Sequence, residues 1–340
     1  MKSFRINKIE EIIAASGAPS YTSSQIFDAL FKKGVKSFSD ITNISKELRK
    51  DLTDKLGNIL SLKQVVVSQG DYANKYLLET RDGERIECVR LSYKNHDALC
   101  LSTQVGCGMG CKFCATGKLG LKRNLSADEI VDQWLFFKQQ QIPVNSITVM
   151  GMGEPFVNPD FFDALSIFLD KRYFGIGARN ISVSTVGVVP GIKKMSSDYP
   201  QVNLAFSLHS PFEEERTSLM PVNSTYSISE VFNALDVHLK KNKRKIFIVY
   251  LLLHEVNDSK EHAEALSKLI NERGENSYLY HVNLMKFHPA PTLMDFQETS
   301  EKSLKQFEIV LMRNGINYTV RQDFGLGIDA ACGQLRAKRI

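Results

Sequence analysis

The sequence lacks any hydrophobic run that approaches the roughly 18 residues of a membrane-spanning helix, and it has no internal repeat or low-complexity tract. Residues 1–17 carry acidic side chains and apolar residues at helical spacing, which is not the pattern of a signal peptide. Cysteine is scarce, with six among 340 residues. In a chain without a signal, these cysteines indicate a reducing cytoplasm and metal or catalytic use rather than structural disulfides. We therefore expect a cytoplasmic protein with no membrane partner.

The overall charge is only weakly basic, with a formal net charge of +5. Such a balance does not by itself identify a partner. The basic residues cluster, however, in residues 118–123, 240–245 and 336–339. One cluster is typical of a solvated surface, but three of them, one directly after a cysteine-rich stretch, favour a nucleic acid as the partner.

Half of the cysteines fall in one glycine-rich stretch, GCGMGCKFCATG, at residues 106–117. Cys107, Cys111 and Cys114 are separated there by three and then two residues, a spacing typical of a metal site. A closed zinc site uses four protein ligands, and an ordinary 4Fe–4S cluster uses four cysteines. Three cysteines therefore predict a cluster with one iron open to a small molecule. The alternative is a group of three buried cysteines that pack as small hydrophobic residues.

Secondary-structure patterns divide the chain into three parts. Residues 1–58 have helical periodicity and predict a small helical accessory domain. Residues 59–96 have strand-like patterns with an Asp82-Gly83 turn, and they predict a β-hairpin extension. Residues 97–340 form the expected core, in which strands and helices alternate.

The core predicts a parallel α/β architecture. Expected strands are residues 98–105, 146–152, 180–186, 202–209, 245–253 and 279–287, and expected helices are 125–140, 228–241, 259–273 and 300–313. The first two helices open with capping boxes, Ser126 with Glu129 and Ser227 with Glu230. Six βα units with right-handed crossovers predict a TIM-type barrel that is closed or only partly closed.

Polar residues follow these strands where each strand ends. In an α/β barrel the C-terminal ends of the strands meet on one face, which holds the active site. The candidates are Gly153 and Glu154 after the second strand, Ser184 near the end of the third, Ser207 and His209 near the end of the fourth, and His288 after the sixth. Their convergence with the cysteine loop predicts a binding site on this face.

A CxxxCxxC loop after the first strand of such a barrel resembles that of the radical S-adenosylmethionine (radical SAM) superfamily. The resemblance implies that Cys107, Cys111 and Cys114 hold a 4Fe–4S cluster and that S-adenosylmethionine (AdoMet) binds its open iron. AdoMet is then cleaved to a 5′-deoxyadenosyl radical, so the cofactor supplies the reactive chemistry. The matching AdoMet contacts are Gly153, Glu154, Ser184, Ser207, Leu208, His209 and, where the family usually has asparagine, His288.

Four strings, MGMGEP, SLHSP, LMPVN and IDAACGQL, narrow this resemblance to the RlmN/Cfr family of radical SAM RNA adenine methyltransferases, and it extends over nearly the whole chain. It implies that Cys332 first takes a methyl group from AdoMet by nucleophilic displacement. After hydrogen abstraction, the S-methylene group of Cys332 adds to a ring carbon of adenine. Cys100 then releases the product by forming a disulfide with Cys332, and Glu87 accepts the ring proton.

The family contains enzymes that methylate C2 of adenine in 23S rRNA and tRNA, and resistance-type enzymes that methylate C8. Residues 199–211, 245–250 and 279–284 resemble the C8 group, whereas GMGEP, residues 44–49 and residues 176–179 resemble the C2 group. We favour C8 methylation of 23S rRNA, which implies resistance to antibiotics of the peptidyl transferase centre. The alternative is C2 methylation of 23S rRNA or tRNA.

The resemblance also implies an electron donor such as flavodoxin and a thiol reductant, and we expect a monomer. Two further interpretations stay open. A non-catalytic zinc-binding RNA module would use His209 or His281 as the fourth ligand. A radical SAM enzyme with a different substrate would not need Cys332.

Overall fold

The computed structural model describes residues 3–289, 295–322 and 324–335. It confirms the expected α/β class. One ten-stranded sheet has the order β1-β2-β3-β4-β7-β8-β9-β10-β11-β12, and every pairing from β4 to β12 is parallel. The basic cluster at residues 336–339 falls outside the described residues. In the described part of the chain, no helix is long and apolar enough to cross a membrane.

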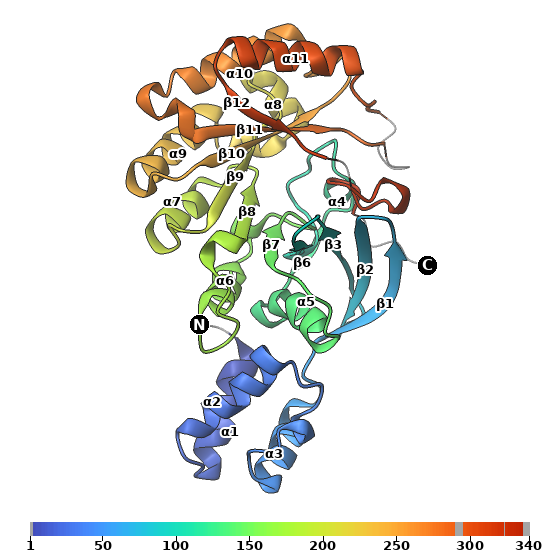
Figure 1. Cartoon of the computed structure of the whole chain (residues 1–340), viewed down its shortest axis with the longest axis vertical. Helices are drawn as coiled ribbons and strands as arrows, with labels where there is room; N and C mark the ends of the chain where they lie inside the picture. Colours follow the sequence, from blue (N-terminus) through green and yellow to red (C-terminus); the bar gives the residue numbers. More distant parts are fainter. Residues whose placement is uncertain (1–2, 290–294, 323, 336–340) are drawn as a thin grey trace.

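The N-terminal region is helical and lies at one end of the molecule, drawn in blue in Figure 1. Its elements are α1 (Phe4–Ser16), α2 (Tyr21–Phe27), the π-helix η1 (Asp28–Lys33), the short η2 (Phe38–Asp40) and α3 (Lys46–Leu56). The Arg5 guanidinium lies 2.7 Å from the Asp132 carboxylate on α5 (Ala127–Gln139). Asp132 also accepts from the Ser61 amide at 2.7 Å. This buried network therefore ties both ends of the helical region to the sheet.

The hairpin extension continues the main sheet. Its strands are β1 (Leu62–Gln69), β2 (Ala73–Thr80) and β3 (Arg85–Ser92), which pair antiparallel with one another, and β3 pairs antiparallel with β4 (Asp97–Cys100). The turn predicted at Asp82-Gly83 joins β2 to β3, and Gly83 has a φ of +81°, which glycine adopts without steric cost.

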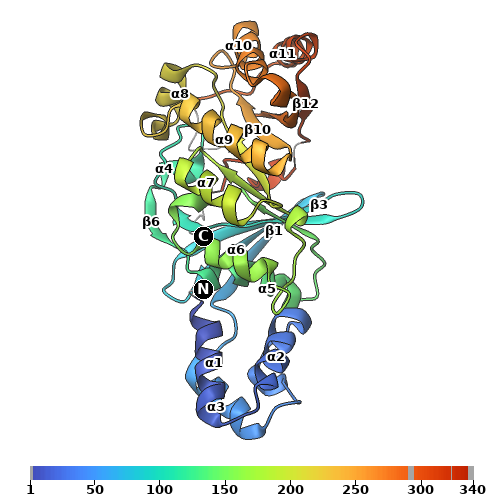
Figure 2. The same ribbon diagram turned by 90° about the vertical axis from the view of Figure 1, so that its left-hand side faces the viewer.

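The parallel strands alternate with helices as predicted. The strands are β4, β7 (Ser146–Val149), β8 (Ile181–Thr185), β9 (Asn203–Ser207), β10 (Ile246–Leu252), β11 (Tyr280–Lys286) and β12 (Asn317–Val320). The helices are α5, α6 (Phe161–Leu169), α7 (Val189–Asp198), α8 (Glu213–Leu219), α9 (Ile228–Asn242), α10 (Lys260–Asn271) and α11 (Glu301–Arg313). Both predicted capping boxes are present. Helices α6, α7, α9 and α10 lie over one face of the sheet (Figures 1 and 2), so the architecture is a partial α/β barrel.

Two details differ from the sequence prediction. The segment expected as one strand, residues 98–105, divides into β4 and β5 (Gln104–Gly106). β5 leaves the main sheet and pairs with β6 (Leu121–Asn124), because Gly106 turns there with a φ of +77°. A Cβ at this position would lie 1.9 Å from the Gly120 carbonyl oxygen. The prediction also missed β12, which is only four residues long and partly exposed.

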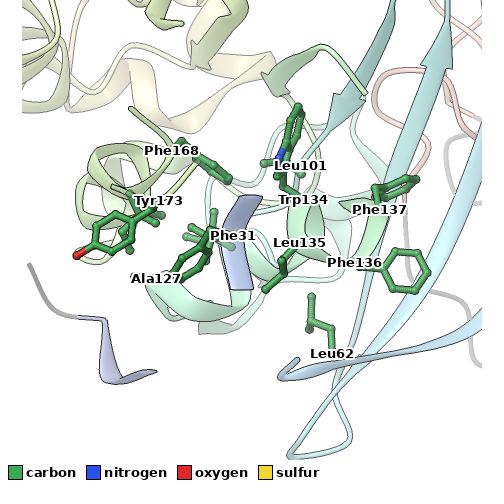
Figure 3. Close-up of a cluster of buried hydrophobic side chains, with 14 of the residues drawn as sticks. Phe31, Leu62, Leu101, Ala127, Trp134, Leu135, Phe136, Phe137, Phe168 and Tyr173 are labelled. Atoms are coloured by element: carbon green, nitrogen blue, oxygen red, sulfur yellow. The ribbon is translucent and has the colours of Figure 1, made fainter. Parts of the chain in front are cut away.

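A continuous aromatic core joins the helical region, α5 and the sheet (Figure 3). The ring of Phe31 from η1 lies 5.3 Å from that of Tyr173, and the ring of Tyr76 on β2 lies 4.7 Å from that of Phe137 on α5. Both contacts are edge-to-face, a geometry that aromatic pairs prefer. This core supports the strand ends from which the functional side chains extend.

Candidate active site

The three cysteines of the predicted cluster loop line one cavity at the C-terminal ends of the parallel strands. The loop runs from β5 through α4 (Ala115–Lys118) to β6. The Cys107 amide donates to the Gly120 carbonyl at 2.9 Å, and the Cys114 amide donates to the Cys111 carbonyl at 3.2 Å. A Cβ on Gly117 would lie 2.9 Å from the carbonyl oxygen of Cys111, so the loop closes this tightly only with glycine there.

The donor set of this loop suits a cluster. Burial raises the pKa of the Cys107 thiol to about 11 and also raises the pKa of Cys111 and Cys114, so these thiols stay protonated unless a metal centre stabilises the thiolates. A single zinc ion binds thiolates about 2.3 Å away, which requires them to crowd together. Among the described residues, no three cysteine, histidine or acidic side chains are arranged to hold one ion. Cysteine thiolates are the usual ligands of iron–sulfur clusters, and the three cysteines of this loop supply that donor type.

Glu154 is a buried acid on the wall of the same cavity. Its carboxylate accepts from the Thr185 hydroxyl at 2.8 Å and from the Val186 amide at 2.9 Å. Burial nevertheless raises its pKa to about 7, because desolvation disfavours the charged form. In the described part of the chain, no basic side chain compensates this carboxylate. An ammonium group on a ligand would supply the missing charge.

The neighbouring predicted contacts also reach this cavity, except Leu208 and His288. Gly153, Ser184 and Ser207 line it, and the two serine hydroxyl oxygens lie 3.3 Å apart. Gly153 has a φ of +104°, and a Cβ there would lie 2.7 Å from the Gln104 side chain. Leu208 is instead buried in the hydrophobic core behind Ser207. Its side chain lies outside the cavity wall.

His209 lines the cavity in one fixed tautomer. Its Nδ1 accepts a hydrogen bond from the Leu251 amide at 2.9 Å, so the neutral ring carries its proton on Nε2. Burial lowers the pKa of His209 to about 3, which keeps the ring neutral. With Nδ1 occupied by the Leu251 amide and Nε2 protonated, neither ring nitrogen has a free lone pair for zinc. His281, the other candidate for a fourth zinc ligand, bonds Thr319 on β12 at 2.8 Å and lies outside this cavity.

A second cavity adjoins the first and holds the two thiols predicted to act outside the cluster. Cys100, Cys332 and His288 line it. Cys332 and Gly333 line both cavities, because the C-terminal segment crosses the cluster loop. The Ala115 amide donates to the Gly333 carbonyl at 2.7 Å. Burial, with a smaller contribution from Cys332, raises the pKa of Cys100 to about 12, and both residues line this cavity.

Glu87 lies outside the walls of both cavities. It is buried on β3, where one carboxylate oxygen lies 3.3 Å from Nζ of Lys75 on β2. Lys75 also donates to the Asp329 carbonyl, three residues before Cys332, at 3.0 Å. Glu87 therefore connects to the Cys332 segment through Lys75 in this structure, rather than by facing the cavity itself.

The sequence prediction missed Arg216, which is fully buried behind the first cavity. Its guanidinium donates to the carbonyls of Val186, Ser207 and Leu208 at 2.7, 3.1 and 3.0 Å, and to Asn223 Oδ1 at 2.6 Å. It therefore fixes the ends of β8 and β9. The only sequence signal was a single arginine at the end of the acidic run EEER, separated by two residues from the LMPVN string.

A partial α/β barrel whose strand ends surround a three-cysteine loop defines a radical SAM protein, and residues 101–266 match the family model described as the radical SAM superfamily. Residues 1–57 match the model of the ribosomal RNA large subunit methyltransferase N-terminal domain. A solved radical SAM methyltransferase from Sphaerobacter thermophilus superposes with a TM-score of 0.91 and 38% identity, covering 98% of each chain.

Two curated relatives specify the family further. The chain is 45% identical to the ribosomal RNA large subunit methyltransferase Cfr of Clostridium botulinum (strain Loch Maree / Type A3), covering 97% of this chain and 96% of the relative. It is 44% identical to the protein of that name from Staphylococcus aureus, with the same coverage. The chain belongs to this family of radical SAM ribosomal RNA large subunit methyltransferases, as the sequence motifs predicted.

Proposed function

We propose that this protein methylates a ring carbon of a specific adenosine in 23S rRNA, with C8 favoured over C2. The observation that carries the proposal is the position of Cys332, which lines both cavities. A thiol that faces a cofactor cavity on one side and a second cavity on the other is suited to carry a methyl group between them. The Cfr relatives, which match over 97% of this chain, support the same reaction class.

The first cavity is the proposed site of the cofactors. Cys107, Cys111 and Cys114 would hold a 4Fe–4S cluster, and the buried carboxylate of Glu154 would bind the AdoMet ammonium group. Gly153, Ser184, Ser207 and His209 line the remaining wall; we assign Leu208 a backbone role and place His288 at the second cavity. When bound, this pair supplies the methyl group and the radical. The barrel residues position AdoMet and exclude water.

The second cavity is the proposed site of the RNA base. Cys332 acts as the nucleophile that accepts the methyl group. Cys100, its neighbour in the same cavity, acts as the resolving thiol and forms a disulfide with Cys332. We assign proton acceptance to Glu87. This role requires either that the ion pair between Glu87 and Lys75 breaks, or that the RNA base reaches past the residues that line the second cavity. A thiol reductant then restores both cysteines.

The remaining assignments follow from this activity. We propose that residues 1–58 form an accessory RNA-binding domain, that residues 59–96 extend the sheet of the core (97–340), and that the protein works as a monomer. An enzyme of this kind needs an electron donor such as flavodoxin and meets its rRNA substrate in the cytoplasm. C2 methylation of 23S rRNA or tRNA is the second candidate, favoured by the match of residues 1–57 to the N-terminal domain model.

Mass spectrometry of 23S rRNA from cells with and without the protein tests the proposal. Fragments are compared with 8-methyladenosine and 2-methyladenosine standards, and a Cys332→Ala variant serves as the matched control. We expect 8-methyladenosine only in cells that carry the intact protein. A signal from 2-methyladenosine alone would replace C8 by C2, and the absence of both products would refute the function.

A further inference from the structure

A row of four aromatic rings leads from the second cavity to the molecular surface. Tyr93 and Phe324 line the cavity, with ring centroids 5.0 Å apart at an interplanar angle of 82°. His96 stacks on Tyr93 at 4.7 Å and 7°. Tyr72 contacts the other side of the row, 6.0 Å from Phe324. We call Tyr72, Tyr93, His96 and Phe324 the aromatic row.

Backbone hydrogen bonds hold the two turns that carry the outer rings. Tyr72 lies in the β1–β2 turn, and its carbonyl accepts from the Ser92 amide at the end of β3 at 2.8 Å. The β3–β4 turn is closed by the Tyr93 amide, which donates to the His96 carbonyl at 2.9 Å. The backbone that carries these rings is therefore held before any ligand arrives, which reduces the conformational entropy lost when a ligand stacks on them.

Phe324 packs against the hydrophobic core, but core packing does not account for the outer rings. Tyr72 is 59% exposed, and His96 is also exposed. Among the described residues, neither Tyr72 nor Tyr93 belongs to a hydrophobic core cluster or packs against one. Exposed, preplaced rings at the mouth of a cavity are the feature that proteins use to stack unpaired bases.

A cation accompanies the rings. Arg321 lines the same cavity as Tyr93. No carboxylate within residues 3–289, 295–322 and 324–335 forms an ion pair with Arg321. Lys94 is exposed in the turn between Tyr93 and His96. Flat rings for bases and free positive charge for phosphate together match the two parts of a nucleotide.

We propose that the aromatic row is the docking surface for the unpaired RNA nucleotides next to the target adenosine, with Arg321 contacting a phosphate. This inference rests on the proposed function and goes beyond it, because it assigns the neighbouring nucleotides rather than the methylated base. The row would hold the RNA strand open at the mouth of the second cavity while Cys332 faces the target base.

The test uses the cluster-loaded full chain and the 23S rRNA fragment that mass spectrometry identifies as methylated. Tyr72→Ala combined with His96→Ala removes both exposed ends of the row. Tyr278→Ala is the matched control, because Tyr278 is 63% exposed and lies in η6 (Gly274–Leu279), outside the row. We expect the double variant to bind the fragment roughly 5- to 100-fold more weakly by fluorescence anisotropy, and the control to bind like the unmodified protein.

An abasic nucleotide beside the target separates stacking from a general loss of structure. The unmodified protein should bind the abasic fragment more weakly than the intact fragment. The double variant, which has already lost the stacking rings, should bind both fragments with the same affinity. Arg321→Gln should make the plot of log K against log salt concentration less steep, by the amount that corresponds to about one phosphate contact. Equal losses on the abasic fragment in both proteins would overturn the inference. If the unmodified protein methylates no RNA, the proposed function fails instead, which is a different result.

Discussion

The ammonium nitrogen of Lys75 lies 3.3 Å from the Glu87 carboxylate on the adjacent strand, and both side chains are largely buried. The same ammonium donates to the Asp329 carbonyl at 3.0 Å. Asp329 has a φ of +50°, in the left-handed region, three residues before Cys332. One side chain therefore connects the proposed proton acceptor to the segment that carries the methyl-accepting thiol.

Replacing Lys75 by methionine should loosen the Cys332 segment. A hydrogen bond from a charged donor contributes roughly 1.5–3 kcal/mol, so its loss should slow formation of the Cys100–Cys332 disulfide about tenfold. The measurement is mass spectrometry of the linked peptides after timed anaerobic addition of diamide, which takes two electrons and two protons from the two thiols. Lys75→Arg, which keeps the positive charge, should retain most of the rate.

Lys122→Met is the control for this experiment. Lys122 pairs with Glu84 at 2.8 Å at the far end of the same hairpin, in an exposed position. The Lys122→Met variant should form the disulfide at an unchanged rate, because exposed ion pairs contribute little to stability. If Lys75→Met forms the disulfide as fast as the unmodified protein, Lys75 does not position the Cys332 segment.

The sequence predicted the cysteine loop and the strand ends because both depend on local features. Spacing identifies Cys107, Cys111 and Cys114, and a parallel sheet brings the C-terminal ends of its strands together. The structure places Glu154, Ser207 and Cys107 on one cavity wall accordingly. Capping boxes such as Ser126 with Glu129 are equally local and are present.

Contacts between distant segments escaped prediction. Arg216 acts through the carbonyls of Val186, Ser207 and Leu208, and nothing near it in the sequence indicates these partners. The Lys75 contact with Asp329 spans 254 residues. Leu208 shows the opposite error, a contact that the motif predicts and the structure does not show. Its position in the motif suggests a cofactor contact, but its side chain is buried in the core. Side-chain direction at a strand end depends on the whole sheet.

Replacing Glu154 by glutamine should weaken AdoMet binding. The glutamine retains the size of the side chain but loses the charge that an ammonium group needs, so affinity should fall about 10- to 100-fold. Equilibrium dialysis of the cluster-loaded protein against labelled AdoMet measures the effect. Glu79→Gln, on β2 and half-buried away from both cavities, is the control. Unchanged AdoMet affinity in Glu154→Gln would remove Glu154 from the proposed cofactor site.

Replacing Arg216 by methionine should destabilise the barrel strongly. The variant removes one donor from three carbonyls that are buried or part-buried and from the Asn223 amide oxygen, and each buried group that loses its partner costs about 1–3 kcal/mol. We expect the free energy of unfolding in urea to fall by at least about 3 kcal/mol. Arg172→Met, which breaks an exposed pair with Asp170, should change it by less than about 1 kcal/mol. Similar losses in both variants would contradict the role given to Arg216.

His238 should make the fold sensitive to acid. It is buried between α9 and α7, where Nδ1 lies 2.9 Å from the Ser196 hydroxyl. Burial, with a smaller contribution from Arg244, lowers its pKa to about 4 from 6.5. Between these two values the unfolded chain binds a proton that the folded chain excludes, so stability is present above about pH 6.5 and is lost as the pH falls toward 4. The full effect is roughly 3 kcal/mol.

His238→Gln removes this titration while keeping a polar side chain at the position. Urea unfolding of the unmodified protein and the variant should therefore give a stability difference that shrinks as the pH falls from 7 to 4.5. The comparison cancels the contributions of His209 and the carboxylates, which titrate equally in both proteins. A difference that stays constant with pH for His238→Gln would mean that folding does not lower the pKa of His238.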